Sequence, residues 1–342
     1  MGTARRNRQI HVREYADGPI GPEHFEVVEA AVPSPGEGEV LVRNTWTSVD
    51  PGMRLRLRAD APAGYFPRFP LGEPLDGVLT VGEVVESRAE GFAPGDTVWH
   101  PFGWREWSLV EAGVDYMNGV ARLQVLETDG AAPRQYLGPL GSMGLTAFAG
   151  LSVAGGLAGG ETVWVSAAAG AVGSLAVQFA LRWGHRVVAS AGSAEKVAWL
   201  ESLGATAFNW RAAPVAEGLA RAAPDGIDIY FDNVGGDHLE AALAALRPGG
   251  RVALCGSISD YEGDPVGPGN LFQATAKELV LRGFRGSLHL DLRAQMQTEV
   301  RAMVADGSLV YEESVYEGLD EAPQAMADML AGRTAGKALV RL

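Results

Sequence analysis

A run of small and apolar residues at 163–173, VWVSAAAGAVG, could hold a phosphate-containing ligand through its backbone. Its first three residues predict a short strand, and the apolar segment 174–181 predicts a helix. Gly170 allows backbone to approach a pyrophosphate, and Gly173 allows the helix to pack closely on the strand. Ala168 stands where a GxGxxG motif has its first glycine. The pattern therefore predicts a dinucleotide-binding turn, although a purely structural turn has the same signature.

The next predicted turn, 188–193, bears on which dinucleotide binds. An acidic residue at the end of the second strand normally holds the ribose hydroxyls of NAD, and this turn has none. Ser193 is placed to cap a helix over 194–203, which puts Lys196 in the first turn. A cation there opposes the helix dipole unless an anion lies nearby. We interpret Ser193 and Lys196 as a clamp for the 2′-phosphate of NADP; the alternative is an exposed lysine on a solvated face. Arg211 could add positive charge.

Beyond about residue 145, short apolar strands alternate with helical segments, as in a doubly wound α/β fold. The predicted strands are 163–165, 186–189, 227–231, 251–254 and 279–281. Turns of small residues follow two of these strands, at 232–236 and 256–257. Because ligands bind beyond the carboxyl ends of the strands in such sheets, we expect both turns to line the cofactor.

The first third of the chain instead has short alternating strands between Pro/Gly turns, which predicts an antiparallel, partly barrel-shaped unit. A length of 342 residues also exceeds what one core usually organises. We predict an α/β protein with a Rossmann cofactor domain over 126–311 and a β-rich catalytic domain built from 1–125 and 312–342. The last strand, 337–341, is expected to return to the catalytic domain.

Charge and cysteine content exclude several classes of protein. The chain has 28 Lys and Arg against 42 Asp and Glu, a net charge of −14, which argues against nucleic acid or an anionic membrane as partner. No apolar run is long enough to span a bilayer. Cys255 is the single cysteine and is expected to be a buried small hydrophobe, and the six histidines show no i, i+4 pairing, so we predict no metal. No apolar export segment follows Arg5 and Arg6, and we expect a cytoplasmic protein.

Five motifs carry a family resemblance: MGLTAF at 143–148, AAAGAVG at 167–173, GSAEK at 192–196, FDNVGG at 231–236 and CGSISDY at 255–261. Together they resemble the medium-chain dehydrogenase/reductase superfamily, in its zinc-free branch of leukotriene B4 12-hydroxydehydrogenases, prostaglandin reductases and alkenal double-bond reductases. The resemblance covers nearly the whole chain. It implies a GroES-like catalytic domain, a homodimer, and NADPH-dependent reduction of the carbon–carbon double bond of an α,β-unsaturated ketone or aldehyde. Zinc alcohol dehydrogenases carry a GHE motif near 72–77, where this chain has no histidine.

The resemblance also implies roles for individual residues. Lys196 matches a lysine on the 2′-phosphate, and Asn233 matches an asparagine on the nicotinamide side of the site. Tyr261 matches a tyrosine near the nicotinamide ribose and the substrate carbonyl. Thr146 belongs to a motif beside the cofactor, and the loop 284–286 resembles a segment that approaches the carboxamide. The full set expected to bind the cofactor is Thr146, Ala168, Gly170, Ala171, Val172, Gly173, Ser193, Lys196, Trp210, Asn233, Cys255, Gly256, Ser257, Ile258, Tyr261, Phe284, Gly286 and Thr334.

Three positions depart from the family pattern. Gly52 stands where the family commonly has a tyrosine in the substrate pocket, so we expect a wider pocket. Trp210 replaces a tyrosine near the 2′-phosphate, and Thr334 replaces an asparagine near the active site. Tyr65 and Phe66 are further candidate substrate contacts.

In the expected reaction the protein mainly positions the cofactor and the substrate, because the cofactor itself carries the hydride. Negative charge develops on the substrate carbonyl oxygen, and Tyr261 is the expected donor, directly or through the ribose 2′-hydroxyl. The alternative is that Tyr261 only packs a loop. The proton donor to the α-carbon is open between Tyr261 and water. Two other functions are also open: a quinone reductase with the same cofactor, and an NADPH-binding protein without turnover.

Overall fold

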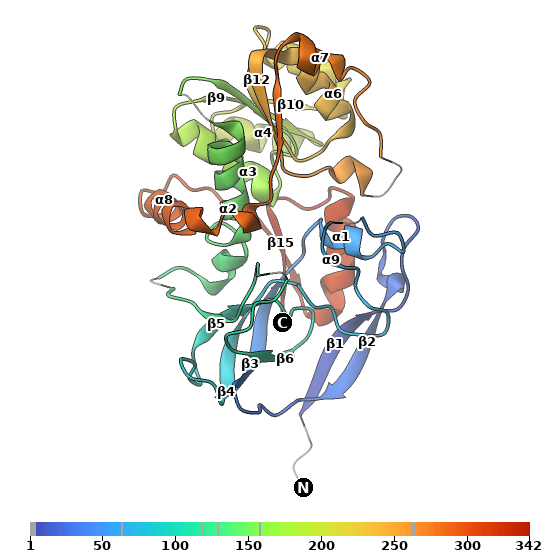
Figure 1. Ribbon diagram of the computed structural model, residues 1–342, viewed down its shortest axis with the longest axis vertical. Helices are drawn as coiled ribbons and strands as arrows, with labels where there is room; N and C mark the ends of the chain where they lie inside the picture. Colours follow the sequence, from blue (N-terminus) through green and yellow to red (C-terminus); the bar gives the residue numbers. More distant parts are fainter. Residues whose placement is uncertain (1–4, 63, 118, 129, 157–158, 262–264) are drawn as a thin grey trace. The chain divides into compact units, whose positions relative to one another are not determined.

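The computed structural model describes residues 5–62, 64–117, 119–128, 130–156, 159–261 and 265–342. The chain divides into two compact units (Figure 1). The terminal unit consists of Met1–Leu137 and Glu313–Leu342, and the central unit is Gly138–Glu312. No helix among the described ranges combines the length and the apolar character that crossing a bilayer requires.

The central unit is built on a six-stranded parallel sheet. Across the sheet the strands are β10 (Thr206–Asn209), β9 (Arg186–Ala191), β8 (Thr162–Val165), β11 (Ile227–Asp232), β12 (Leu246–Leu254) and β13 (Val280–Gly283). In chain order this is 3-2-1-4-5-6, the doubly wound dinucleotide-binding arrangement. The direction in which strands are added reverses between β8 and β11, so the loops that follow these two strands are neighbours.

Burial explains why the sequence pattern located these strands. All four residues of β8 are buried, and parallel strands covered on both faces read as continuous apolar runs. The core includes Trp164, which stacks on Tyr230 with 4.3 Å between the ring centroids. The helices of this unit are α2 (Ser142–Ala149), a π-helix (Gly150–Gly155), α3 (Ala171–Arg182), α4 (Ala194–Ser202), α5 (Val215–Ala222), α6 (Gly236–Ala245), α7 (Phe272–Ala276) and α8 (Arg293–Ala305).

The terminal unit is β-rich, as expected. Its main sheet has the order β14 (Glu313–Glu317), β15 (Lys337–Arg341), β3 (Glu39–Ser48), β4 (Thr80–Ser87), β5 (Thr97–His100) and β7 (Gln124–Val125), and β6 (Trp107–Glu111) also pairs with β3. β15 runs antiparallel to β3, which confirms that the last strand returns to this unit. A separate hairpin pairs β1 (Arg6–Val12) with β2 (Phe25–Ala31), and the α-helices are α1 (Met53–Arg56) and α9 (Ala322–Leu330).

Residues 126–137, expected to open the cofactor domain, belong to the terminal unit. The 3₁₀ helix Pro133–Leu137 contacts β3 and β4, and β7 pairs with β5. These contacts tie the segment to the terminal sheet, which a composition change along the sequence does not reveal.

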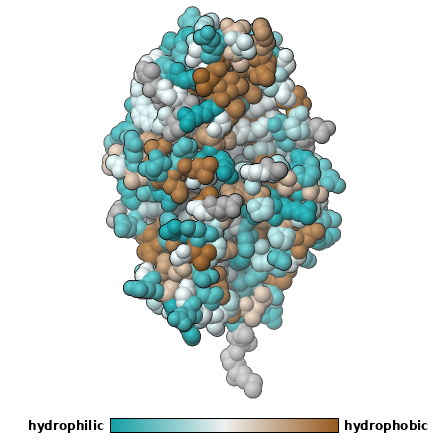
Figure 2. Space-filling view, viewed as in Figure 1, coloured by the Kyte–Doolittle hydropathy of each residue, from teal (hydrophilic) through white to brown (hydrophobic). Residues whose placement is uncertain are grey.

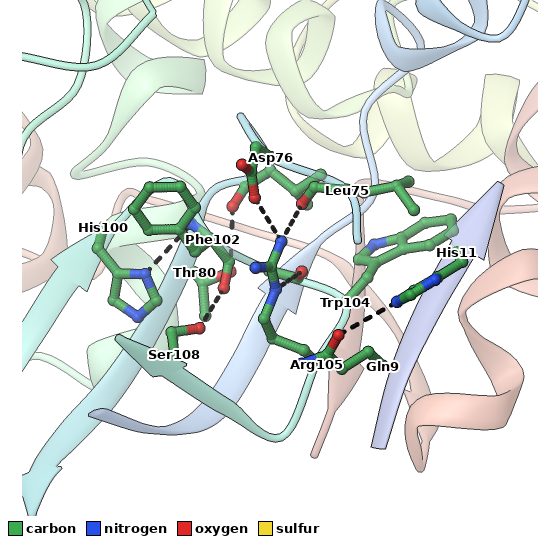
Figure 3. Close-up of polar contacts among 12 residues, drawn as sticks. Gln9, His11, Leu75, Asp76, Thr80, His100, Phe102, Trp104, Arg105 and Ser108 are labelled. Carbon is green, nitrogen blue, oxygen red and sulfur yellow. Dashed lines mark hydrogen bonds and ion pairs between the residues drawn. The ribbon is translucent and has the colours of Figure 1, made fainter. Parts of the chain in front are cut away.

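Buried polar side chains link the loops of the terminal unit (Figure 3). Nδ1 of His100 accepts from the backbone N–H of Phe102 at 3.2 Å, and Nε2 of His100 lies 3.0 Å from Oδ1 of Asn44. This pairing fits a neutral ring that donates from Nε2. Burial, with a smaller effect of the Arg105 charge, lowers the pKa of His100 to about 3.

Candidate functional site

Two glycines, Gly170 and Gly173, lie at the turn after β8, and Gly173 is the one that a side chain could not replace. A Cβ atom at Gly173 would lie 2.4 Å from the carbonyl oxygen of Ala167 and 2.8 Å from Cα of Ala168, so only glycine fits there. A Cβ atom at Gly170, the N-cap of α3, would approach the Ala167 oxygen at 3.2 Å. The close packing expected at Gly173 is therefore present, and it brings the start of α3 against the turn. The first amides of a helix lack intrahelical acceptors and can bind an anion.

Positive charge gathers at the turn after β9. Oγ of Ser193 accepts from the backbone N–H of Lys196 at 3.3 Å, which confirms the predicted helix cap. A Cβ atom at Gly192 would lie 3.4 Å from both Nε1 of Trp210 and Nε of Arg211, so these side chains border the same turn. Burial lowers the pKa of Lys196, and the charge of Arg211 lowers it further. Two mutually repelling cations therefore lie together in a chain with a net charge of −14.

The loops after β8 and β11 are hydrogen-bonded to each other. Nδ2 of Asn233 donates to the carbonyl oxygen of Ser166 at 2.8 Å, and the Asn233 backbone N–H donates to Oγ of Ser166 at 3.0 Å. This joins residues separated by 67 positions at the place where the strand order reverses. The sequence reasoning singled out Asn233 but missed Ser166.

Asp232, at the end of β11, organises the same loop. Its Oδ1 accepts from the hydroxyl of Tyr230 at 2.7 Å and from the backbone N–H groups of Val234 at 2.9 Å and Gly235 at 2.8 Å. Its carbonyl oxygen accepts from the N–H of Gly256 at 3.0 Å, in the loop after β12. Burial raises the pKa of Asp232. Asp232 is not among the residues expected at the site, although an acidic residue at the end of an apolar strand is a sequence feature that could have indicated it.

Tyr261 lies at the end of the loop after β12. A Cβ atom at Gly256 would be 3.5 Å from the Tyr261 hydroxyl, so the phenol lies against the backbone of Gly256. The backbone N–H of Ile258 donates to the carbonyl oxygen of Asn233 at 3.2 Å, which joins this loop to the one after β11. Ser257 is hydrogen-bonded to Asp260 in the same loop.

Cys255 is partly exposed as a residue, whereas a buried small hydrophobe is expected from the sequence. Burial, with a smaller effect of the Asp232 charge, raises the pKa of its thiol to about 12. The thiol therefore stays protonated at neutral pH and is a poor nucleophile.

Thr146, Phe284 and Gly286 lie close together although they are distant in sequence. A Cβ atom at Gly286 would lie 2.4 Å from Oγ1 of Thr146, so the 284–286 segment passes directly over α2. The backbone N–H of Phe284 donates to the carbonyl oxygen of Leu254 at 3.3 Å, at the end of β12. The structure thus places these three residues with the loops at the carboxyl edge of the sheet.

Four of the expected site residues belong to the terminal unit: Gly52, Tyr65, Phe66 and Thr334. A Cβ atom at Gly52 would lie 2.5 Å from the hydroxyl of Tyr65, so the phenol fills the space that a side chain at position 52 would enter. Tyr65 therefore occupies the space beside Gly52, and a wider substrate pocket at this position stays a prediction. Thr334 lies in the loop between α9 and β15.

Among the residues that the structure describes, no three His, Cys, Asp or Glu side chains gather as the ligands of a metal ion would.

The chain matches two family models, described as the N-terminal domain of oxidoreductase over residues 8–117 and as zinc-binding dehydrogenase over residues 171–305. It is 37% identical to the NADP(+)-dependent 2-alkenal reductase of Nicotiana tabacum over 342 residues, which cover 98% of this chain and 97% of the relative. It is also 37% identical to prostaglandin reductase 1 of Mus musculus, with 93% and 94% of the two chains covered. The crystal structure of CurA in complex with NADPH from Vibrio vulnificus superposes with a TM-score of 0.88 at 32% identity and covers 98% of each chain. The chain therefore belongs to the zinc-free branch of the medium-chain dehydrogenase/reductase superfamily and is an oxidoreductase.

Proposed function

We propose that this protein is an NADPH-dependent reductase that delivers hydride to the β-carbon of an α,β-unsaturated ketone or aldehyde. The observation that carries the cofactor assignment is the cationic turn after β9, where Ser193, Lys196, Trp210 and Arg211 meet. The tobacco relative is named for reduction of 2-alkenals, which supports the substrate class.

The residues of the central unit fit such a cofactor. Gly173 leaves room for α3 to pack closely on the turn after β8, and the first amides of α3, at Ala171 and Val172, would hold the pyrophosphate. Lys196 and Arg211 would bind the 2′-phosphate, since a phosphate dianion removes the repulsion between them. NADPH, when bound, supplies the hydride.

The loops after β11 and β12 would hold the reacting end of the site. Asp232 and Ser166 fix the backbone around Asn233, which would face the nicotinamide. The hydroxyl of Tyr261 would donate a hydrogen bond to the substrate carbonyl oxygen, where negative charge builds up during reduction. Thr146, Phe284 and Gly286 would line the part of the site that faces the carboxamide group of the nicotinamide.

The test is NADPH oxidation against a panel of enals, enones, quinones and simple alcohols, with wild type and Tyr261→Phe. We expect turnover of enals or enones, and a drop in kcat on the order of 10²-fold in Tyr261→Phe with nearly unchanged NADPH binding. Tyr116→Phe is the matched control, because that hydroxyl is hydrogen-bonded to the backbone of Glu111 in the terminal unit. Turnover of quinones alone would replace the proposal with a quinone reductase. Tight NADPH binding without any turnover would leave a binding protein.

We also propose that two copies of the chain pair through β13. This strand is hydrogen-bonded to β12 and forms one edge of the sheet. Val280 is 51% exposed and Phe272, on α7, is 76% exposed. Apolar surface is visible at the end of the molecule where Figure 1 labels α7 (Figure 2). Antiparallel pairing about Val280 would bring each Val280 opposite its counterpart in the other copy and continue the sheet from one copy into the next.

A further inference from the structure

Tyr230 carries a hydroxyl group in the core of the central unit. Its side chain is fully buried and stacks on Trp164 of the neighbouring strand β8. The phenol oxygen lies 2.7 Å from Oδ1 of Asp232 and 2.9 Å from Oγ of Ser166. Since a hydroxyl group can donate one hydrogen bond and accept others, it can be bonded to both groups at once.

The parallel pairing of β8 and β11 brings these residues together. Tyr230 is paired with Trp164 in the ladder, and Asp232 lies two positions further along β11, on the same face of the strand. Ser166 lies two positions beyond Trp164, directly after β8. The phenol is therefore placed between the carboxyl ends of two strands, at the point where the strand order reverses.

Each partner of the phenol fixes the backbone of a loop. Oγ of Ser166 accepts from the backbone N–H of Asn233 at 3.0 Å. Oδ1 of Asp232 accepts from two backbone N–H groups in the loop after β11, and its carbonyl oxygen accepts from the N–H of Gly256 in the loop after β12. The hydroxyl group of Tyr230 therefore joins two side chains that each hold part of the candidate site.

Packing alone does not require this hydroxyl group, because a phenylalanine would keep the ring and its stack on Trp164. A buried hydroxyl group costs free energy unless it is hydrogen-bonded, so its place in the core depends on Ser166 and Asp232. Burial, with a smaller effect of the Asp232 charge, raises the pKa of Tyr230 well above its usual value, so the phenol keeps its proton at neutral pH. Because the side chain is fully buried, it would act on a bound cofactor through its partners rather than by contact.

We propose that Tyr230 is a positioning residue for hydride transfer, because its hydroxyl group holds the loops after β8 and β11 at the spacing that the nicotinamide ring requires. The inference rests on the proposed function and adds a residue to the same reaction. Hydride transfer depends steeply on the placement of the two reacting carbons, and a displacement of about 1 Å can cost about 10²-fold in rate. Cofactor affinity depends more on the phosphate contacts at α3 and at the turn after β9. Loss of the hydroxyl group should therefore slow the hydride step more than it weakens NADPH binding.

The test is Tyr230→Phe, which removes one oxygen atom and keeps the ring. We expect kcat per folded protein to fall about 5- to 20-fold, less than for a displacement of a full ångström. We expect Kd for NADPH, measured by fluorescence titration, to change by less than about threefold. With NADPH deuterated at both C4 positions, the primary isotope effect on kcat should rise, because a slower hydride step limits turnover more fully.

Tyr136→Phe is the matched control. Tyr136 is also buried, and its hydroxyl group donates to the carbonyl oxygen of Glu127 at 2.5 Å in the terminal unit. This variant loses a phenol hydrogen bond of the same kind and should leave kcat and the isotope effect unchanged. Unfolding in urea gives the stability of both variants, which separates a loss of stability from a loss of rate.

A second variant tests the link from its other end. Ser166→Ala removes the hydroxyl group that is bonded to the phenol and also an acceptor for the Asn233 N–H, so kcat should fall at least as far as in Tyr230→Phe. The double variant should be slower than Ser166→Ala by less than about twofold, because the link between the two loops is already broken. If Tyr230→Phe yields no folded protein, Ser166→Ala must show the fall in kcat and the rise in the isotope effect by itself.

Three results would overturn the proposal: an unchanged kcat in Tyr230→Phe, a fall in kcat without a rise in the isotope effect, and effects of the two variants that multiply in the double variant. Each would leave the hydroxyl group with a structural role. If the wild type reduces no acceptor, the proposed function fails, and amide hydrogen exchange of the NADPH-bound protein tests the link between the loops separately. Faster exchange over 233–236 in Tyr230→Phe than in Tyr136→Phe supports the link, and equal exchange overturns it.

Discussion

The cationic turn after β9 makes a quantitative prediction about cofactor choice. Lys196→Met keeps most of the side-chain length and removes the charge that would face the 2′-phosphate. A hydrogen bond to a charged group contributes about 1.5–3 kcal/mol, which corresponds to roughly 10- to 150-fold in affinity. Arg211 remains in the variant, so we expect the lower half of this range. Affinity for NADH, which has no 2′-phosphate, should change by less than about twofold.

The assay is fluorescence titration with NADPH and NADH at low and high salt. Raising the salt should weaken NADPH binding to wild type more than to Lys196→Met, because the lost interaction is partly exposed. Arg221→Met is the matched control: it removes a positive charge of the same unit that is 66% exposed and paired with Glu217. Equal weakening of NADPH and NADH binding would refute the phosphate clamp, and so would an effect of Arg221→Met as large as that of Lys196→Met.

The clamp also has a predicted pH dependence. Burial and Arg211 lower the pKa of Lys196 in the free protein, so the lysine loses its proton at a lower pH than an exposed lysine does. The preference for NADPH over NADH should therefore decline as pH rises toward the alkaline range, starting below the ordinary lysine pKa of 10.5. It should also decline below about pH 6, where the 2′-phosphate takes up a proton. A preference that is flat over this whole range would contradict the charge-based explanation.

Three further predictions concern packing, acid stability and assembly. Gly173→Ala places a methyl group 2.4 Å from the Ala167 oxygen and should lower the free energy of unfolding, measured by urea titration, by about 1–3 kcal/mol. Gly170→Ala, whose methyl group would lie 3.2 Å from the same oxygen, should lower it clearly less. Folding lowers the pKa of His100 from 6.5 to about 3, so in acid the unfolded chain takes up a proton that the folded protein does not. The free energy of unfolding should therefore fall by about 2–3 kcal/mol between about pH 7 and pH 4.5. The fall should be smaller in His100→Gln, which cannot take up this proton. Val280→Glu places two like charges opposite each other across the proposed β13 pairing and should yield monomers in light scattering, while an unchanged mass would move the interface elsewhere.

The sheet of the central unit could be predicted because its physics is local. Buried parallel strands are continuous apolar runs, and Ser193 caps α4 through atoms three residues apart, so a single window of sequence contains both signals. The close packing at Gly173 could also be predicted locally, because the atom that excludes a side chain there belongs to Ala167, in the same turn.

The remaining parts of the site depend on residues that meet only after folding. Ser166 and Asn233 are 67 positions apart, and no pattern around either indicates that they bond. The same holds for Tyr65, whose hydroxyl fills the space at Gly52. The boundary between the units was misplaced for this reason too, because residues 126–137 join the terminal unit through contacts with β3 and β4.

The position of β15 constrains the order in which the protein can be built. β15 lies between β14 and β3, so the main sheet of the terminal unit joins strands from both ends of the chain. During synthesis the edge of β3 at residues 46–48 must wait until residues 337–341 leave the ribosome, whereas the contiguous central unit is complete at residue 312 and can fold earlier. An early-made, unpaired β-sheet edge is an aggregation risk, so the nascent chain depends on its earliest strands staying soluble until its last ones arrive.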